Sequence, residues 1–523
     1  QEHSLRHSLL VLAKIMTRVA VATTSANAAD AAPEVAAAGG NAVDCALGTA
    51  IAAMNLEPGV CAFAGGAYVT VWAPDKDPVT FDGNHAVPGT GLDATERARG
   101  KVPVRLDYGG GVTTIVGAGS VAIPGALAAI DSAWRQYGQI AWRDLFAPSI
   151  HAARTGFPLS ESCRYYLGYS GDPIFGRSRD GYAALHDQEG RLLDGGDPVH
   201  VPHLADTLAA IAEEGADLFY AGELGQAISD HVRNGDGALT REDLAAFEAI
   251  ERRALVTDIG TWHIATNPPP AVGGAVLTAM LLACRDLRAD DWDRDALDRL
   301  IQVQRACLDF RRDRLDIAED VVGQATQLLH AARDGKLLSR WTSSSTIHVS
   351  AVDDSGLGCT VTASAGYGSG EMPDGTGLWL NNGLGEIELN RRDVETREPG
   401  ERVPSNMAPT VARRNGAVLA IGSPGADRIT TAIHQVLTNF MQFDMPLREA
   451  ISHPRLHVDT TGSTDQLRAE PGLDLPPTEL PQHVFDGTNM YFGGVSVASF
   501  DVDAGFEVVA DARREGGVFL SEA

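Results

Sequence analysis

The chain has 523 residues, of which 44% are apolar and 21% are charged, and both fractions are ordinary for a globular protein. Its formal net charge is −27, which disfavours binding to nucleic acid or to an anionic membrane surface, because both carry negative charge. The six cysteines form no Cys-x-x-Cys pair, a pattern that favours isolated thiols in a reducing compartment over a disulfide framework.

The first fifteen residues contain a brief apolar run that Lys14 interrupts, and no small-residue cleavage site follows it. We interpret residues 1–15 as an extension or tag-like segment ahead of a start near Met16. The longest uncharged stretch, residues 108–130, includes Pro124 and several glycines and is therefore a poor membrane helix. We expect a soluble, cytoplasmic protein without a membrane segment.

The first half of the chain predicts a strand, two alanine-rich helices, further strands and then a long helical region. Ser25 and Asn41 are candidate N-caps of the two alanine-rich helices, and Thr240 with Asp243 resembles a capping box. The expected elements are strands at 19–23, 68–72 and 79–81, and helices at 25–38, 41–54, 126–137, 142–155, 204–214, 223–232, 244–250, 274–285 and 296–315.

The pattern changes near residue 340, where period-two alternation replaces helical periodicity. Residues 346–352 and 359–364 alternate on either side of a turn, which predicts an antiparallel hairpin. Two further hairpins are expected, at 410–413 with 418–421 and at 495–502 with 506–510, and Asp427 opens a helix that runs to about residue 443. Because no linker separates the halves, we expect strands from both to share one core between helical layers.

Several familiar site motifs are incomplete. Gly117 and Gly119 partly match a dinucleotide fingerprint, but Pro124 interrupts the helix that such a loop would open. Residues 234–237 look like part of a calcium loop, yet Val232 occupies its first ligand position. The pentapeptide Gly-x-Ser-x-Gly of serine hydrolases is missing. We therefore expect no cofactor and no metal.

A cluster of small polar residues, ending in Ser345 and Thr346, stands directly before the first strand of the predicted hairpin. Such clusters are usually loops, and the cluster alone does not exclude this. A threonine hydroxyl is a weak nucleophile that needs a base within hydrogen-bond reach. The free α-amine of the same residue, with an ordinary pKa of roughly 7.7–8.0, would supply one. A cut between Ser345 and Thr346 would create that amine.

Motifs spread over nearly the whole chain resemble the γ-glutamyltransferase family and occur in that family's order. They are Asn41-Ala-Val-Asp-Cys-Ala46 after two glycines, Glu57-Pro-Gly59, Gly65-Gly66, Ser120-Val-Ala-Ile-Pro-Gly125, Leu239-Thr-Arg-Glu-Asp-Leu244, residues 346–353, Leu380-Asn-Asn382, Pro404-Ser-Asn-Met-Ala-Pro-Thr410 and Gly422-Ser-Pro-Gly-Ala-Asp-Arg428. The resemblance implies an α+β fold, the αββα four-layer sandwich of N-terminal-nucleophile (Ntn) hydrolases. It also implies a large subunit, 16–345, and a small subunit, 346–523, that form one structural unit.

The resemblance assigns the catalytic roles to four residues. Thr346 matches the nucleophile, and Ser364 matches a hydroxyl residue that hydrogen-bonds it. Gly425 and Ala426 match the segment whose backbone N–H groups stabilise the oxyanion. Alanine can replace glycine in that segment if its backbone conformation permits, because the side chain takes no part.

The substrate-binding residues depart from the family pattern. Glu386 aligns with the Asp that holds the substrate's α-amine, and Ser405 keeps a hydroxyl, but Asn406 replaces the second Ser of a Ser-Ser pair. The Arg that holds the substrate carboxylate belongs to a segment that here ends in Asn84-His85. A charged bidentate clamp has become a neutral amide beside a histidine.

These patterns predict a hydrolase in which Thr346 attacks a carbonyl and water releases the acyl group, on a substrate other than an ordinary γ-glutamyl amide. Homologues in antibiotic pathways are associated with hydrolysis of a carbon–carbon bond next to a ketone, and the lost Arg makes this chain similar to them. One alternative is a conventional γ-glutamyl hydrolase or transpeptidase for glutathione-type substrates that holds the carboxylate with Arg428 or His85. Another is an uncut, noncatalytic binding homologue.

The partners expected are a small-molecule substrate and the two subunits of one precursor. A homodimer of such two-subunit units is an arrangement that the sequence leaves open.

Overall fold

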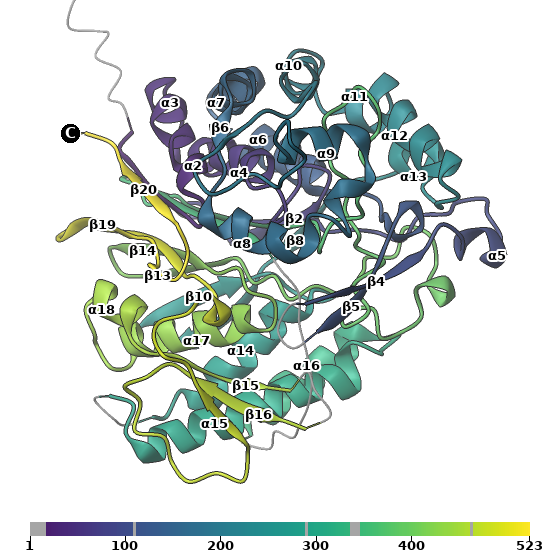
Figure 1. Cartoon of the computed structure of the whole chain (residues 1–523). Helices are drawn as coiled ribbons and strands as arrows, with labels where there is room; N and C mark the ends of the chain where they lie inside the picture. Colours follow the sequence, from purple (N-terminus) through teal and green to yellow (C-terminus); the bar gives the residue numbers. More distant parts are fainter. Residues whose placement is uncertain (1–16, 108–110, 288–290, 335–345, 461–463, 523) are drawn as a thin grey trace, which may run out of the picture.

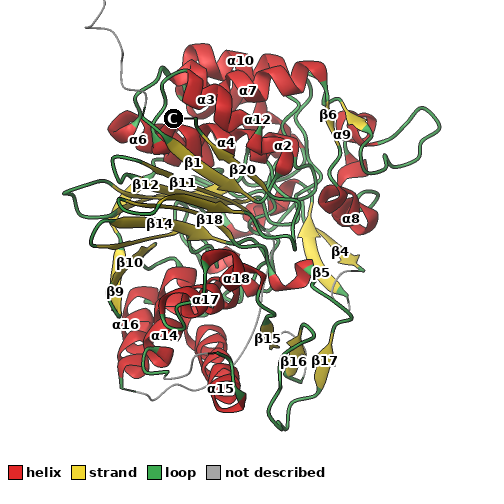
Figure 2. Cartoon of the chain, turned by 90° about the vertical axis from the view of Figure 1, so that its left-hand side faces the viewer, coloured by secondary structure: helices red, strands yellow, loops and turns green. Residues whose placement is uncertain are grey.

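Two antiparallel β-sheets stack face to face, and helices cover the outer face of each sheet (Figure 1). Figure 2 shows the four layers edge-on, with α3, α4, α7 and α10 on one side of the sheets and α14, α16 and α17 on the other. The computed structural model describes residues 17–107, 111–287, 291–334, 346–460 and 464–522. The predicted α+β sandwich is confirmed, whereas the extension predicted at residues 1–15 lies outside the described residues.

The first sheet takes its strands from both sides of residue 346. Its order is β20, β1, β11, β12, β2, β3, β8, and every neighbouring pair is antiparallel. These strands are β1 (Val19–Thr23), β2 (Gly66–Trp72), β3 (Val79–Gly83), β8 (Ile250–Arg253), β11 (Ile347–Asp353), β12 (Gly358–Ser364) and β20 (Gly517–Leu520).

The second sheet is also antiparallel throughout, in the order β19, β18, β14, β13, β10, β9. Its strands are β9 (Leu255–Ile259), β10 (Trp262–Thr266), β13 (Thr410–Arg414), β14 (Ala417–Gly422), β18 (Ser496–Asp501) and β19 (Gly505–Val509). Smaller sheets are formed by β4 (Val102–Leu106) with β5 (Val112–Val116), by β6 (Phe157–Pro158) with β7 (Pro198–Val199), and by β15 (Leu456–Asp459), β16 (Gln466–Ala469) and β17 (Gln482–Val484).

The helices divide between the two outer faces. On the side of the first sheet lie α2 (Ala26–Ala29), α3 (Ala31–Ala37), α4 (Ala42–Leu56), α6 (Ala126–Tyr137), α7 (Trp142–Thr155), α8 (Glu161–Ser170), α9 (Arg179–Leu185), α10 (Leu204–Glu214), α11 (Asp217–Tyr220), α12 (Glu223–Asn234) and α13 (Arg241–Ala245). On the side of the second sheet lie α14 (Val272–Cys284), α15 (Arg294–Phe310), α16 (Val321–Arg333), α17 (Arg428–Met441) and α18 (Leu447–Ser452).

Shorter helical pieces complete the list. They are α5 (Ala94–Arg97), the 3₁₀ turns Ala118–Ser120, Phe175–Arg177, Val394–Thr396 and Met490–Phe492, and a π-helical turn, Arg311–Leu315, that continues α15. Among the described residues, no helix is both long and apolar enough to cross a bilayer.

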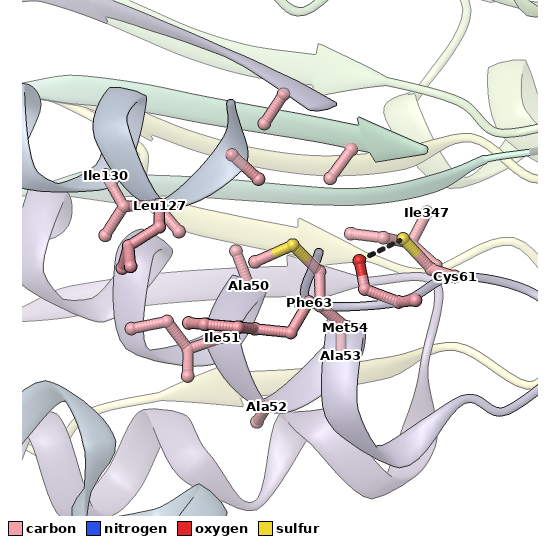
Figure 3. Close-up of a cluster of buried hydrophobic side chains, with 14 of the residues drawn as sticks. Ala50, Ile51, Ala52, Ala53, Met54, Cys61, Phe63, Leu127, Ile130 and Ile347 are labelled. Carbon is pink, nitrogen blue, oxygen red and sulfur yellow. Dashed lines mark hydrogen bonds between the residues drawn. The ribbon is translucent and has the colours of Figure 1, made fainter. Parts of the chain in front are cut away.

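Side chains of β11 alternate between the helical layer and the second sheet. Ile347 and Val349 belong to the large core around α4, whereas Val352 packs between the sheets with residues of β14 and β18. Figure 3 shows part of the large core, in which Ile347 clusters with Ile51 of α4 and with Phe63. This packing anchors the start of β11, and period-two alternation places the residues at 346, 348 and 350 on the side of the second sheet.

The predicted caps and hairpins are largely confirmed. Asn41 and Asp44 form a capping box at the start of α4, and the Ser25 hydroxyl accepts the N–H of Ala28 at the start of α2. The three hairpins predicted after residue 346 are β11–β12, β13–β14 and β18–β19.

Three predictions in the first half need correction. The helix expected at 25–38 is divided at Asp30, which ends α2 and precedes α3. The helix expected at 244–250 is wrong, because α13 ends at Ala245 and β8 begins at Ile250 to pair with β3. The β9–β10 hairpin was not predicted, although alternating residues flank Gly260, whose positive φ of 59° makes the turn.

Candidate functional site

One small pocket brings together residues that are far apart in the sequence. Among its lining are the predicted nucleophile, its hydroxyl partner and every predicted substrate-binding residue. The pocket is lined by Asn84, His85, Thr346, Ser364, Glu386, Leu389, Pro404, Ser405, Asn406 and Met407. Gly425 and Ala426 do not line it, and Ser345 lies outside the described residues.

Strand pairing places the two hydroxyl residues at the same end of two central strands of the first sheet. Ile347 at the start of β11 pairs with Ala363 of β12, so the same register sets Thr346 opposite Ser364. Thr346 is only 2% exposed. The Ser364 hydroxyl accepts the N–H of Gly366 at 3.1 Å. Asn84 and His85 follow β3, whose last residue lies at this same end of the sheet. Ser405 and Asn406 precede β13.

Gly425 and Ala426 form the turn between β14 and α17, and both have positive φ angles, 116° and 66°. Their carbonyls accept the N–H groups of Arg428 and Ile429, at 3.0 and 3.2 Å. Within the part of the chain that the structure describes, neither of their own N–H groups has an acceptor. Ala426 thus adopts the left-handed conformation that costs an L-residue roughly 1–2 kcal/mol, and such strain is typical of functional turns.

His348, which the sequence analysis did not single out, connects the two sheets behind Thr346. The hydroxyl of Ser350 donates to the carbonyl of Ser496 at 3.1 Å, so it accepts from Nε2–H of His348 at 2.8 Å. Nδ1 of His348 then accepts from the hydroxyl of Thr362 at 2.8 Å. Burial lowers the pKa of His348 to about 3, so the imidazole is neutral. The alternation of polar residues at 346, 348 and 350 was the signal for this buried row.

The segment that has lost the family's Arg is held by other contacts. Asn84 donates from Nδ2 to the carbonyl of Val403 at 2.8 Å. Asp82, fully buried two residues earlier, pairs with Arg252 at 2.8 Å and with Arg402 at 3.5 Å. Burial lowers the pKa of His85 to about 4, which leaves this imidazole neutral. Within the described chain, its buried Nε2 has no hydrogen-bond partner.

Asn406 and Asp427 form a buried pair at the back of the pocket. Nδ2 of Asn406 donates to Oδ1 of Asp427 at 3.0 Å, and Nη1 of Arg311 donates to the same oxygen at 2.6 Å. Arg311 also binds Asp316 at 3.1 Å through Nε. Burial raises the pKa of Asp427 against the effect of Arg311, and it raises the pKa of Asp316 to about 6.

The prediction that Asp427 opens α17 is right in position, but its side chain makes no cap bond. The carboxylate turns instead to Arg311 and Asn406. Arg311 was not predicted as part of the site, because its contact with Asp427 joins residues 116 positions apart.

Among the described residues that line the pocket there is neither Lys nor Arg. Arg428, one of the two cations considered as substitutes for the lost Arg, donates from Nε to the carbonyl of Tyr491 at 2.9 Å. Its guanidinium also lies over the ring of Tyr491, 4.6 Å from the ring centroid. His85, the other candidate, is neutral. The described lining therefore combines the carboxylate of Glu386 with neutral polar and apolar groups.

Known proteins resemble this chain over most of its length. A family model described as gamma-glutamyltranspeptidase matches residues 28–521. The glutathione hydrolase proenzyme of Pseudomonas aeruginosa is 28% identical over 474 residues, which cover 84% of this chain and 82% of that protein. The glutathione hydrolase proenzyme of Escherichia coli is 25% identical over 502 residues, covering 88% and 84%.

Two solved structures share the fold over nearly their full length. A cephalosporin acylase from Bacillus halodurans superposes with a TM-score of 0.79 at 23% identity, covering 96% of both chains. The structure of LmbA2991HD gives a TM-score of 0.75 at 18% identity, covering 96% of this chain and 98% of that one. Because the family model spans nearly the whole chain, the protein belongs to the γ-glutamyltranspeptidase family and is an Ntn-hydrolase-fold enzyme of the hydrolase and transferase class.

Proposed function

We propose that this enzyme cuts its own chain between Ser345 and Thr346 and then hydrolyses an acyl substrate with Thr346 as nucleophile. The products of the cut are a large subunit, 16–345, and a small subunit, 346–523. Support comes from the pocket, where Thr346 and Ser364 lie with the candidate substrate-binding residues. The relatives' name, proenzyme, agrees with a single precursor.

The reaction follows from the groups at the site. The α-amine of Thr346 accepts the Oγ proton while Oγ bonds to the carbonyl carbon, and the carbonyl electron pair moves to oxygen. The N–H groups of Gly425 and Ala426 are the proposed donors to that oxyanion. Its collapse expels the leaving group, which takes the proton back from the ammonium. Water then adds to the acyl-enzyme by the same steps and releases a carboxylic acid and free Thr346.

The single observation that carries the specificity is that the described residues of the pocket lining include neither Lys nor Arg. A γ-glutamyl group carries an α-carboxylate, and leaving that charge unpaired in a buried pocket is costly. We therefore propose a substrate other than an ordinary γ-glutamyl amide. One candidate for the bond that the enzyme cleaves is a carbon–carbon bond next to a ketone, in natural-product biosynthesis. Attack on a ketone forms the same oxyanion, and the leaving carbon departs with the bonding pair and takes up a proton.

The second candidate is a conventional γ-glutamyl hydrolase or transpeptidase, which the names of the glutathione hydrolase relatives favour. It requires another cation for the substrate carboxylate. The contacts of Arg428 with Tyr491 and the neutral state of His85 weigh against it.

The cut is tested on purified protein by gel electrophoresis and mass analysis. We expect two fragments, the smaller beginning Thr-Ile-His-Val, and a single intact chain for Thr346→Ala. Thr326→Ala, on the exposed face of α16, is the control and is expected to be cut like the wild type. A stable uncut wild-type chain would contradict the proposal and favour a noncatalytic binding homologue.

Substrate preference is tested with γ-glutamyl p-nitroanilide. Because the described lining contains no guanidinium, we expect KM above the usual enzyme range of about 1 µM–1 mM. The measurement is initial rate against concentration for fully cut enzyme, with Thr346→Ala as the blank. Rapid turnover with a micromolar KM would support the conventional γ-glutamyl enzyme instead.

A further inference from the structure

Asn406 presents a defined atom to the pocket. It lines the pocket and is only 5% exposed, and its Nδ2 is already bound to Asp427. Its carbonyl oxygen Oδ1 is buried and has no partner within the described chain. Burial without a hydrogen bond is costly for an amide oxygen, so this atom is a candidate for contact with a ligand.

Asp427 and Arg311 fix which end of the amide faces the ligand. Oδ1 of Asp427 accepts from both Arg311 and Asn406. Turning the amide around would set its oxygen against that carboxylate oxygen and would lose a hydrogen bond. Arg311 is held in place by Asp316 at 3.1 Å, and the side chains of all three ionised residues are at most 3% exposed. The network therefore holds the amide with its acceptor toward the pocket.

The pocket is complementary to a donor. Asn406 contributes a buried amide oxygen, and among the lining residues that the structure describes there is neither Lys nor Arg. An amine or ammonium on the substrate would satisfy this acceptor. A substrate carboxylate would meet an acceptor and no described side-chain cation, which is unfavourable in a buried site.

We propose that Asp427 is a positioning residue that sets substrate specificity by holding the Asn406 oxygen toward the pocket. The substrate class is an acyl compound that carries an amine or ammonium and lacks the neighbouring carboxylate of a γ-glutamyl group. This inference rests on the proposed function, because it concerns the acyl group that Thr346 attacks.

Four p-nitroanilides that differ only in the acyl group test the proposal. The 4-aminobutanoyl probe carries the amine alone, the glutaryl probe the carboxylate alone, the γ-glutamyl probe both and the butanoyl probe neither. For cut wild-type enzyme we expect the highest kcat/KM with 4-aminobutanoyl and the lowest with glutaryl. Thr346→Ala corrects for spontaneous release.

Variants then separate positioning from folding. Asn406→Leu keeps the volume but removes the acceptor, and we expect it to lower the 4-aminobutanoyl to butanoyl ratio of kcat/KM about tenfold. Asp427→Ser frees the amide to turn and should lower the same ratio, mainly through KM. Asp465→Asn, which alters another Asp–Arg pair, that of the buried Asp465 with the partly exposed Arg305, is the control and should keep the wild-type ratio.

The outcomes distinguish this inference from the proposed function. A chain that stays uncut contradicts both. A correctly cut enzyme that prefers butanoyl or glutaryl, or that hydrolyses none of the probes, overturns the inference and leaves the proposed cut standing. Unchanged ratios in Asn406→Leu and Asp427→Ser would show that the preference does not arise from this amide.

Discussion

Ala426 is the residue at which the proposed oxyanion turn is most restricted. Its φ of 66° suits glycine, is tolerable for alanine and is poor for a β-branched side chain. The turn works through backbone N–H groups, so the side chain matters only through the conformation that it permits.

Substitution of Ala426 tests whether this turn supports catalysis. We expect Ala426→Gly to keep kcat near the wild-type value, because the left-handed conformation is retained without strain. Ala426→Val should lower kcat by about 100-fold or more, the usual cost of losing an oxyanion donor. Kinetics on cut enzyme, with unfolding curves to confirm folding, measure both. Equal kcat in the two variants would contradict a role for this turn.

At the scale of residues, the sequence predicted the polar residues of the pocket lining but not the residues that hold them in place. The polar residues were predicted because the family resemblance assigned them roles, whereas Leu389, which also lines the pocket, was not singled out. Arg311 and His348 were not found, because they touch their partners Asp427 and Ser350 in a buried network that no local pattern specifies. Such contacts depend on how the sheets and helices stack, which single-sequence periodicity does not determine.

At the scale of elements, the spacing between β11 and β14 depends on one imidazole. His348 of β11 packs on Gly422, the last residue of β14, and a methyl group at Gly422 would overlap the ring. Gly422 also leads into the segment that carries Gly425 and Ala426. Through this ring, β11, which follows the nucleophile, contacts β14, which precedes the oxyanion turn.

Gly422→Ala is expected to lower the free energy of unfolding by about 1–3 kcal/mol, the usual cost of overpacking, and to slow the cut at Thr346. Combining it with His348→Ala should recover part of that loss, because the methyl group then has space. Denaturant unfolding of the two single variants and the double variant measures the coupling. Strictly additive losses would show that the ring and the glycine do not press on each other.

Strands and helices with strong signals were predictable, and their ends were not. The capping box at Thr240 located the start of α13 correctly, but a cap gives no information on where a helix ends. β8 was not predicted because Ile250–Arg253 is a short, mostly charged strand at the edge of the sheet. Neither alternation nor an apolar run indicates such a strand in the sequence.

At the scale of the whole molecule, buried titratable groups make stability depend on pH. Burial lowers the pKa of His85 and His434 to about 4 and of His348 and His457 to about 3. The unfolded chain binds a proton at an ordinary histidine pKa of about 6.5. The stability that these neutral rings contribute is therefore complete above that pH and is lost as the pH falls toward the folded values.

Buried carboxyl groups act in the opposite direction. Burial raises the pKa of Asp316 to about 6 and of Glu388 to about 7. The folded protein therefore binds these protons first, and they add stability as the pH falls from 7 toward the ordinary carboxyl range.

The contribution of these histidines to the free energy of unfolding should accordingly be smaller at pH 5 than at pH 7.5. Each histidine contributes up to about 1.4 kcal/mol per pH unit to the slope. His434→Phe, a substitution in α17 away from the pocket lining, should reduce that slope by one such contribution. Urea unfolding across this pH range measures both, and an unchanged slope in His434→Phe would contradict the assignment.

Strand β1 runs between β11 and β20. If the chain is cut before residue 346, we therefore expect that the two subunits do not exchange between molecules. Releasing the N-terminal portion would mean stripping hydrogen bonds from both sides of β1 and also opening the contact of β12 with β2. The two polypeptides would therefore remain associated after the cut. A mixture of two differently labelled proteins would then contain no hybrid molecules. Both subunits of each active site would come from one translation product.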